Sequence, residues 1–303
     1  WRYRSVPFTA GEGVRPLQDM RQPSTAGIAL VLLSACAFGS MAIFARGAFA
    51  AGANVSGLLA GRFAIAGILL AILLLATGRK FPRGRPLVFA IAMGGIGYVG
   101  QAACFFEALQ YASSGLVALL LYVYPTLVVL LSAAFLHEKL TGRKLVLLAV
   151  SFAGLALMLG GGSGSPMGIG LGLAAAGIYS VYILVGSREL ANTDALASAT
   201  VICLSAATTL GIASLFIDTR LPGTWWGWAA VAALGIVGGV VAILAFFAGL
   251  KRVGPSVASV VSTFEPVFTA ALAWFVLGES LTPGQLAGGV LVIASAAWLA
   301  RTR

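Results

Sequence analysis

Ten long apolar stretches with few charged residues dominate this chain of 303 residues. They lie near residues 25–45, 55–77, 86–109, 114–135, 143–160, 167–186, 195–217, 224–250, 255–277 and 283–300. An α-helix needs roughly 20 apolar residues to cross the hydrocarbon core of a bilayer. Every backbone polar group in lipid must also be paired internally, and the stretches lack the strict alternation of transmembrane strands. We therefore predict an all-α integral membrane protein with ten transmembrane helices.

The composition excludes a water-soluble protein. Only 9% of the residues are charged and 60% are hydrophobic, whereas about 25% of a typical globular chain is charged. A net charge of +10 would suggest nucleic acid on a soluble fold, but here we expect the lipid bilayer as partner and no nucleic acid. The three cysteines lie inside apolar stretches without metal-ligand spacing, so we expect no metal and no cofactor.

The basic residues predict the orientation in the membrane. With the N-terminus inside, sixteen of the nineteen Lys and Arg fall in cytoplasmic segments, Arg46 and Arg220 fall outside, and Arg62 lies within a helix. This asymmetry follows the positive-inside rule. The first 22 residues are polar and lack the apolar core of a signal peptide. We expect both termini to be cytoplasmic and residues 1–24 to form a cytoplasmic tail.

The two halves of the chain align with each other at an offset of 141 residues. The most specific matches are Pro125 with Pro266, Glu138 with Glu279, and Thr141 with Thr282. Five helices per copy would turn the second copy upside down, and the basic loop at 139–144 indeed corresponds to an uncharged loop at 280–285. We predict two inverted five-helix repeats, residues 25–160 and 167–303, joined by an external linker at 161–166. Such architectures usually serve alternating access at a midplane site.

This pattern resembles the drug/metabolite transporter superfamily in its ten-helix EamA-type family. The resemblance rests on the five-plus-five duplication, on a proline in helices four and nine, and on the Leu-x-Glu-x-Leu-Thr stretch that ends each of them. The chain is similar to bacterial aromatic amino-acid exporters, which implies a secondary transporter, not an enzyme, in a bacterial inner membrane. The family often has Glu-Pro in helix nine, as in Glu265-Pro266, whereas Tyr124-Pro125 in the first half departs from that pattern.

The resemblance implies export of small metabolites, foremost amino acids including aromatic ones. Export of drugs, nucleobases or sugars on the same scaffold is the alternative. The scarcity of buried charge favours a neutral or zwitterionic substrate. Two other classes fit less well: an intramembrane enzyme would need acid/base or metal groups at one depth, and a passive channel would conduct without saturation.

Polar side chains at membrane depth are candidates for the substrate site because they are costly in lipid. The substrate-binding candidates are Tyr98, Gln101, Tyr122, Tyr179, Tyr182, Ser259 and Thr263. Helix packing is the alternative role for each of them. Tyr122 and Tyr124 are expected about 200° apart on a helix, so only Tyr122 is predicted to face the cavity. Pro125 and Pro266 are expected to kink their helices.

Three charged residues are candidates for proton coupling or for structural ion pairs: Glu265, Glu107 and Arg62. Arg62 is the only cation in the middle of a span, and either carboxylate is a possible partner for it. Glu138 and Glu279 end their helices, and we expect them to be solvated or to act as caps.

Overall fold

The described part of the chain is helical. The computed structural model describes residues 24–160, 163–277 and 282–301. Within these ranges the only β-type pairing is an isolated bridge between Ala112 and Gly164. Most of the predicted N-terminal tail, residues 161 and 162 of the predicted linker, and Glu279 lie outside the described residues.

Five crossings form the first half of the bundle. They are α1 with α2, then α3, then α4 continued by η2 and α5, then α6 with α7, and finally α8. Their bounds are α1 Thr25–Gly39, α2 Met41–Ala50, α3 Val55–Ala76, α4 Arg85–Ala92, η2 Met93–Tyr98, α5 Val99–Ala108, α6 Ser114–Leu121, α7 Tyr124–Leu136 and α8 Gly142–Leu159.

The second half contains five more crossings. The bounds are α9 Pro166–Glu189, α10 Ala195–Ala213, α11 Trp225–Leu234, η3 Gly235–Val241, α12 Ala242–Ser262, α13 Glu265–Leu277 and α14 Pro283–Arg301. Gly254, with φ 78° and ψ 168°, turns the chain within α12 ahead of Pro255. The part of α12 before this turn completes the eighth crossing, and the part after it forms the ninth with α13.

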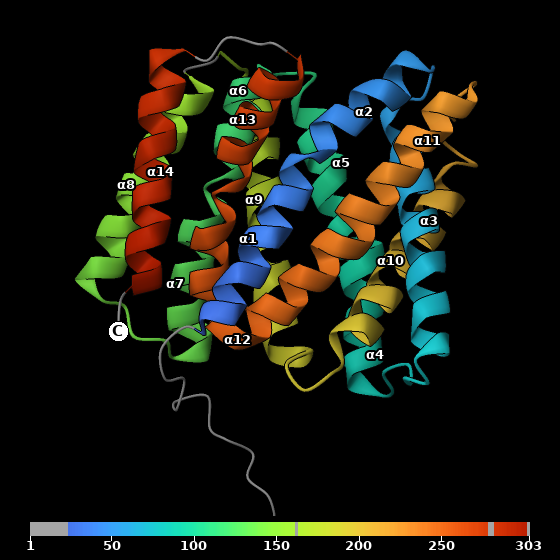
Figure 1. The fold of residues 1–303 in the computed structure, drawn as a ribbon, viewed down its shortest axis with the longest axis horizontal. Helices are drawn as coiled ribbons and strands as arrows, with labels where there is room; N and C mark the ends of the chain where they lie inside the picture. The colour runs from blue at the N-terminus through green and yellow to red at the C-terminus, as the bar shows by residue number, and fades with distance from the viewer. Residues whose placement is uncertain (1–23, 161–162, 278–281, 302–303) are drawn as a thin grey trace, which may run out of the picture.

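The predicted all-α membrane fold is confirmed. Eight helical segments in the described residues have the length and apolar composition to span a bilayer, and one of them, Trp225–Ser262, contains the turn at Gly254. The apolar helices α13 and α14 supply the remaining spans. Because the number of crossings is even, the described chain begins and ends at the same end of the bundle (Figure 1).

Helix contacts follow the duplication. α1 packs along α12, and the equivalent contact in the other half is that of α9 with α5 and α6. The pairs α3 with α10 and α8 with α14 each join equivalent helices of the two repeats. Figure 1 shows α8 and α14 side by side at one edge of the bundle, with α3 and α11 at the opposite edge. The two inverted repeats are therefore interleaved.

The shared Leu-Thr motif starts a helix in each repeat. The Thr141 side chain accepts a hydrogen bond from the Lys144 amide at the start of α8. The Thr282 side chain accepts one from the Gln285 amide at the start of α14, while the Gln285 side chain accepts one from the Thr282 amide. These threonines satisfy amides that have no partner within the helix, which explains why threonine occurs at both positions.

Two π-helical segments also occur at equivalent places. η2 and η3 interrupt the third and eighth crossings, where glycines allow the backbones to touch. A Cβ atom on Gly94 would lie 2.2 Å from the Ile202 carbonyl oxygen of α10, and one on Gly235 would lie 3.1 Å from the Arg62 carbonyl oxygen of α3. Segments of π-helix occur frequently at functional sites.

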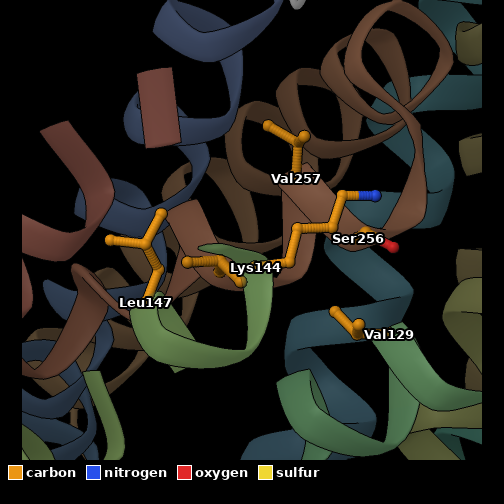
Figure 2. Close-up of a pocket in the computed structure, with 6 residues that line it drawn as sticks. Val129, Lys144, Leu147, Ser256 and Val257 are labelled. Carbon is orange, nitrogen blue, oxygen red and sulfur yellow. The ribbon is translucent and has the colours of Figure 1, made fainter. Parts of the chain in front are cut away.

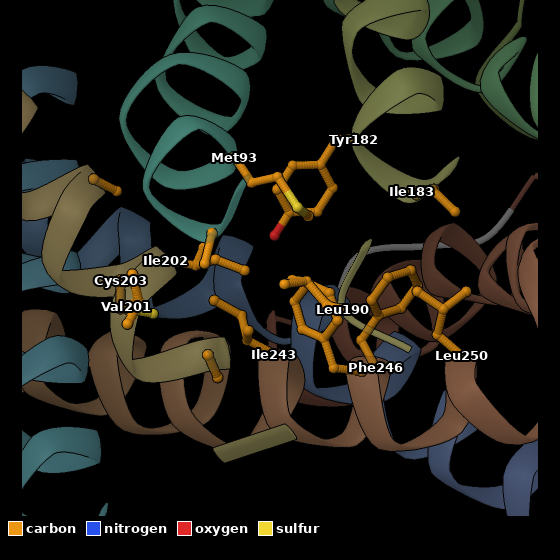
Figure 3. Close-up of a cluster of buried hydrophobic side chains, with 14 of the residues drawn as sticks. Met93, Tyr182, Ile183, Leu190, Val201, Ile202, Cys203, Ile243, Phe246 and Leu250 are labelled. Atoms are coloured by element: carbon orange, nitrogen blue, oxygen red, sulfur yellow. The ribbon is translucent and has the colours of Figure 1, made fainter. Parts of the chain in front are cut away.

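The main buried core lies between the repeats. Figure 3 shows its centre, where Tyr182 of α9 lies beside Met93 of η2, with Ile202 of α10 and Phe246 of α12 nearby. The lateral surface, in contrast, exposes many large apolar side chains, such as Ile96 of η2, which is 75% exposed. An apolar exterior of this kind suits a protein that is surrounded by lipid.

Candidate substrate site

The fourth and ninth crossings are each broken at the same place in the repeat. α6 ends at Leu121 and α7 begins at Tyr124, while α12 ends at Ser262 and α13 begins at Glu265. Pro125 and Pro266 are the second residues of the new half-helices, a position where proline is well tolerated because its missing N–H needs no helical partner. Discontinuous helices at the repeat interface are the usual setting of transporter binding sites.

Five tyrosines form a connected row of rings that starts at the break in the fourth crossing, and we call this row the tyrosine chain. The ring centroids of Tyr122 and Tyr124 are 6.1 Å apart, and those of Tyr124 and Tyr179 are 4.7 Å apart. The row continues from Tyr179 to Tyr182 at 6.0 Å and from Tyr182 to Tyr98 at 6.1 Å. Tyrosine rings supply apolar area together with a polar hydroxyl, which suits a site for an amphipathic solute.

Tyr122 and Tyr124 were expected about 200° apart because the fourth crossing was taken to be one continuous helix. The break at Tyr122 and Val123 removes that condition, and the two rings approach each other. Tyr124 is the member that contacts Tyr179. Its hydroxyl also donates a hydrogen bond of 3.4 Å to the Ser259 carbonyl oxygen.

Arg62 lies at one end of the tyrosine chain. Its Nη2 atom donates hydrogen bonds to the Tyr98 hydroxyl at 3.1 Å and to the Gly238 carbonyl at 3.0 Å. Its guanidinium carbon lies 4.9 Å from the centre of the Phe63 ring. The ion pair considered from the sequence is not formed, because no described carboxylate oxygen lies within 4.0 Å of Arg62.

Glu265 lies near the other end of the tyrosine chain, at the break in the ninth crossing. It is half-buried although it lies deep within the ninth crossing. Its carboxylate is near enough to interact electrostatically with the hydroxyls of Tyr122, Tyr124 and Tyr179, and with Arg62. The negative charge is also placed favourably at the N-terminus of α13. Glu265 therefore brings an acidic group to the tyrosine chain.

Tyr122 and Thr263 meet in a small pocket on the side that faces α8. The pocket is lined by Tyr122, Pro125, Thr126, Leu148, Ser151, Phe152, Leu155 and Thr263. The hydroxyls of Thr263 and Ser151 are 3.0 Å apart. Ser259 is fully buried, and its hydroxyl donates to the Ser256 carbonyl. Ser259 of α12 thus contacts the tyrosine chain through Tyr124, and Thr263, which follows α12, lines the pocket beside Tyr122.

The two remaining candidates lie on α5. Gln101 is half-buried and follows Tyr98 by one turn. Glu107 is exposed near the end of α5. Glu107 does not meet Arg62.

A polar contact that the sequence did not predict joins the two repeats near the end of α7. Glu138 accepts a hydrogen bond of 2.5 Å from the Ser256 hydroxyl and one of 3.1 Å from the Lys144 ammonium. The expectation of a solvated or capping Glu138 is therefore wrong, because the turn at Gly254 brings Ser256 to it. Figure 2 shows the neighbouring pocket, in which Lys144 and Ser256 lie close to Val129 and Val257.

Interleaved inverted repeats, broken helices and an embedded polar row define a polytopic membrane transporter. The chain belongs to the EamA-like transporter family, which it matches twice, over residues 25–160 and 166–301.

Individual relatives agree with this assignment. The chain is 32% identical over 241 residues to the uncharacterized inner membrane transporter YedA of Escherichia coli strain K12, covering 77% of this chain and 78% of the relative. It is 26% identical over 253 residues to a probable terminal-alkyne amino-acid exporter of Streptantibioticus cattleyicolor, covering 80% and 83%. A solved crystal structure is similar with a TM-score of 0.81 and 25% identity, over 92% of this chain and 99% of that one.

Proposed function

We propose that this transporter exports small metabolites, foremost amino acids including aromatic ones, by alternating access. The observation that carries the proposal is the tyrosine chain, which extends from the breaks in the fourth and ninth crossings, where Glu265 lies, to Tyr98 and Arg62. The aromatic rings match the ring or alkyl group of such a solute, and the buried Arg62 offers a cation for its carboxylate. The similarity to an amino-acid exporter supports the same substrate class.

In this proposal the two repeats, residues 25–160 and 167–303, are the units that rock against each other. The linker at 161–166 lies outside, and both termini, including the tail at 1–24, lie in the cytoplasm of a bacterium. The asymmetry of sixteen inside basic residues to two outside supports this orientation. Rocking of one repeat against the other would open the tyrosine chain to each side in turn.

The binding residues in the proposal are the tyrosine chain members Tyr98, Tyr122, Tyr179 and Tyr182, with Gln101 beside them. Ser259 of α12 and Thr263, which follows α12, support the tyrosine chain, and Pro125 and Pro266 lie at the start of the half-helices that carry Tyr124 and Glu265. Glu265 is the candidate for proton coupling, whereas the exposed Glu107 is left with a structural role. The site needs no cofactor for this function.

Counterflow in proteoliposomes tests the proposal. Vesicles loaded with unlabelled phenylalanine should accumulate labelled phenylalanine in a saturable manner, and external methionine or phenylalanine should compete. The same assay with drugs, nucleobases and sugars as competitors tests the alternative substrates. Absence of exchange across an amino-acid panel, with exchange of one of those other classes, would overturn the amino-acid assignment.

A further inference from the structure

We propose that Arg62 binds the carboxylate of the transported solute, so that the solute is a monocarboxylate. This inference rests on the proposed function and specifies its recognition chemistry. It begins from the charge state of the core: among the described residues, Arg62 is the only charged residue classed as buried, with 3% of its surface exposed.

No described carboxylate bonds directly to Arg62, and Glu265 interacts with it only from beyond 4.0 Å. The Nε atom of Arg62 is buried and has no hydrogen-bond partner. The two groups that do accept hydrogen bonds from it, the Tyr98 hydroxyl and the Gly238 carbonyl, are both uncharged. Burial of a cation that has no directly bonded carboxylate costs free energy. A buried guanidinium N–H without a hydrogen-bond acceptor adds to that cost. A ligand carboxylate would offset both costs, because its two oxygens match the planar fork of a guanidinium.

The surroundings hold the guanidinium in place before any ligand binds. Its carbon lies 4.9 Å from the Phe63 ring centre and 5.7 Å from that of Tyr98. The backbone of Arg62 is packed against η3, where a Cβ on Gly235 would lie 3.1 Å from the Arg62 carbonyl oxygen. A fixed donor loses less entropy on binding than a mobile one. Arg62 is therefore preorganised, as expected for a binding residue.

The position of Arg62 also suits a transport site. Arg62 belongs to α3 of the first repeat and bonds to Gly238 of η3 in the second, so its contacts connect the two repeats. Tyr98, its other partner, is the end member of the tyrosine chain. A solute carboxylate on Arg62 would thus leave the rest of the solute along the aromatic rings.

The comparison of the two repeats indicates how many carboxylates the solute carries. The residue equivalent to Arg62 in the second repeat is Cys203, which is fully buried in α10. The duplicated site therefore carries one cation instead of two, and one carboxylate neutralises it.

Ligand binding to the purified full chain in detergent tests this inference. The probes are phenylalanine and phenylalanine amide, which share the ring and the ammonium group and differ in the carboxylate. The wild-type protein should bind phenylalanine roughly 10- to 100-fold more tightly than the amide, the range of a charge-assisted hydrogen bond to a charged group. Arg62→Gln should bring the two affinities to within about twofold, since the charge that distinguishes the probes is gone.

Two further variants serve as controls. Arg220→Gln removes an exposed cation that pairs with Asp218 at 3.0 Å, and it should keep the full preference for phenylalanine. Arg62→Lys retains the charge but not the fork, and it should show an intermediate preference. The lysine variant also provides the test if the glutamine variant does not fold.

The outcomes separate this inference from the proposed function. Equal wild-type affinity for phenylalanine and its amide, or an unchanged preference in Arg62→Gln, would overturn the role of Arg62, while saturable amino-acid exchange would still support the carrier. Carboxylate-dependent binding that is lost in Arg62→Gln, without exchange of any amino acid, would support Arg62 and overturn the amino-acid carrier.

Discussion

Tyr124 and Glu265 occupy the same position in the two repeats, and each is the first residue of a half-helix that follows a break. Equivalent residues of α1 and α9 pack on their backbones. A Cβ on Gly39 would lie 2.8 Å from the Glu265 carbonyl oxygen, and the Ser180 hydroxyl donates to the Tyr124 carbonyl at 3.2 Å. The backbone arrangement is thus duplicated while the side-chain chemistry is not. One repeat contributes an aromatic hydroxyl and the other a carboxylate.

Replacing Glu265 by Gln should remove the pH dependence of transport. Among the groups that interact with it, Arg62, Tyr122, Tyr124 and Tyr179, none is acidic. The glutamine keeps the size of the side chain but cannot release a proton. Uptake of labelled phenylalanine measured from about pH 5 to 8 should become flat, whereas a preserved pH profile would leave Glu265 with a structural role.

Replacing Tyr122 or Thr263 by Ala should change the order in which amino acids compete for transport. Both residues line the pocket beside Pro125 and Leu148, so shortening either one alters the shape of that wall. Because a single methylene in a pocket already changes discrimination roughly 10- to 200-fold, removal of the larger groups of Tyr122 or Thr263 should change it by at least about tenfold. Competition assays with a fixed panel measure the order, and surface expression is the control. An unchanged order in both variants would remove the pair from the site.

The sequence predicted the crossings well because composition encodes them locally. The predicted boundary between the eighth and ninth helices falls at Gly254, where glycine takes up a φ of 78°. The breaks at Tyr122 and Thr263 were harder to predict from the sequence, since a proline is compatible both with a kink and with the first turn of a new helix.

Side-chain partners were hidden for a different reason. Most of these helices carry apolar residues on all of their faces. No amphipathic stripe therefore indicates which face of a helix packs against which neighbouring helix. The contacts of Arg62 with Gly238, and of Thr263 with Ser151, join helices that are distant in sequence. Such pairs follow from tertiary packing alone, and for that reason the sequence suggested an ion pair for Arg62 instead.

Replacing Gly94 by Ala should destabilise the protein. A Cβ at this position would lie 2.2 Å from the Ile202 backbone oxygen, so η2 would have to move away from α10. Overpacking of this kind typically costs about 1–3 kcal/mol. Thermal unfolding in detergent should show a lower midpoint. Gly177→Ala in α9, where no atom lies within 4 Å of the added carbon, is the matched control and should leave the midpoint unchanged or raise it.

Replacing Ser256 by Ala should loosen the contact between the repeats at Glu138. The variant loses a hydrogen bond to a charged group, worth roughly a tenfold shift in a local equilibrium. With the native cysteines replaced, a cysteine at Val260, which lines the adjacent pocket, should react faster with a thiol reagent. Ser295→Ala is the control, because that hydroxyl bonds only within α14. Equal reaction rates of this cysteine in the protein with Ser256 and Ser295 intact, in Ser256→Ala and in Ser295→Ala would contradict the prediction. They would show that the contact between Ser256 and Glu138 does not restrict access to the pocket at Val260.

The central claim is that two copies of one five-helix unit lie in opposite orientations across the bilayer, with the solute site between them. Single cysteines introduced at Gly142 and Pro283, the first residues of α8 and α14, test it through labelling by a membrane-impermeant reagent. We expect the cysteine at 142 to react only from the cytoplasmic side and the cysteine at 283 only from the external side. Labelling of both from the same side would contradict the inverted repeat and the transport mechanism built on it.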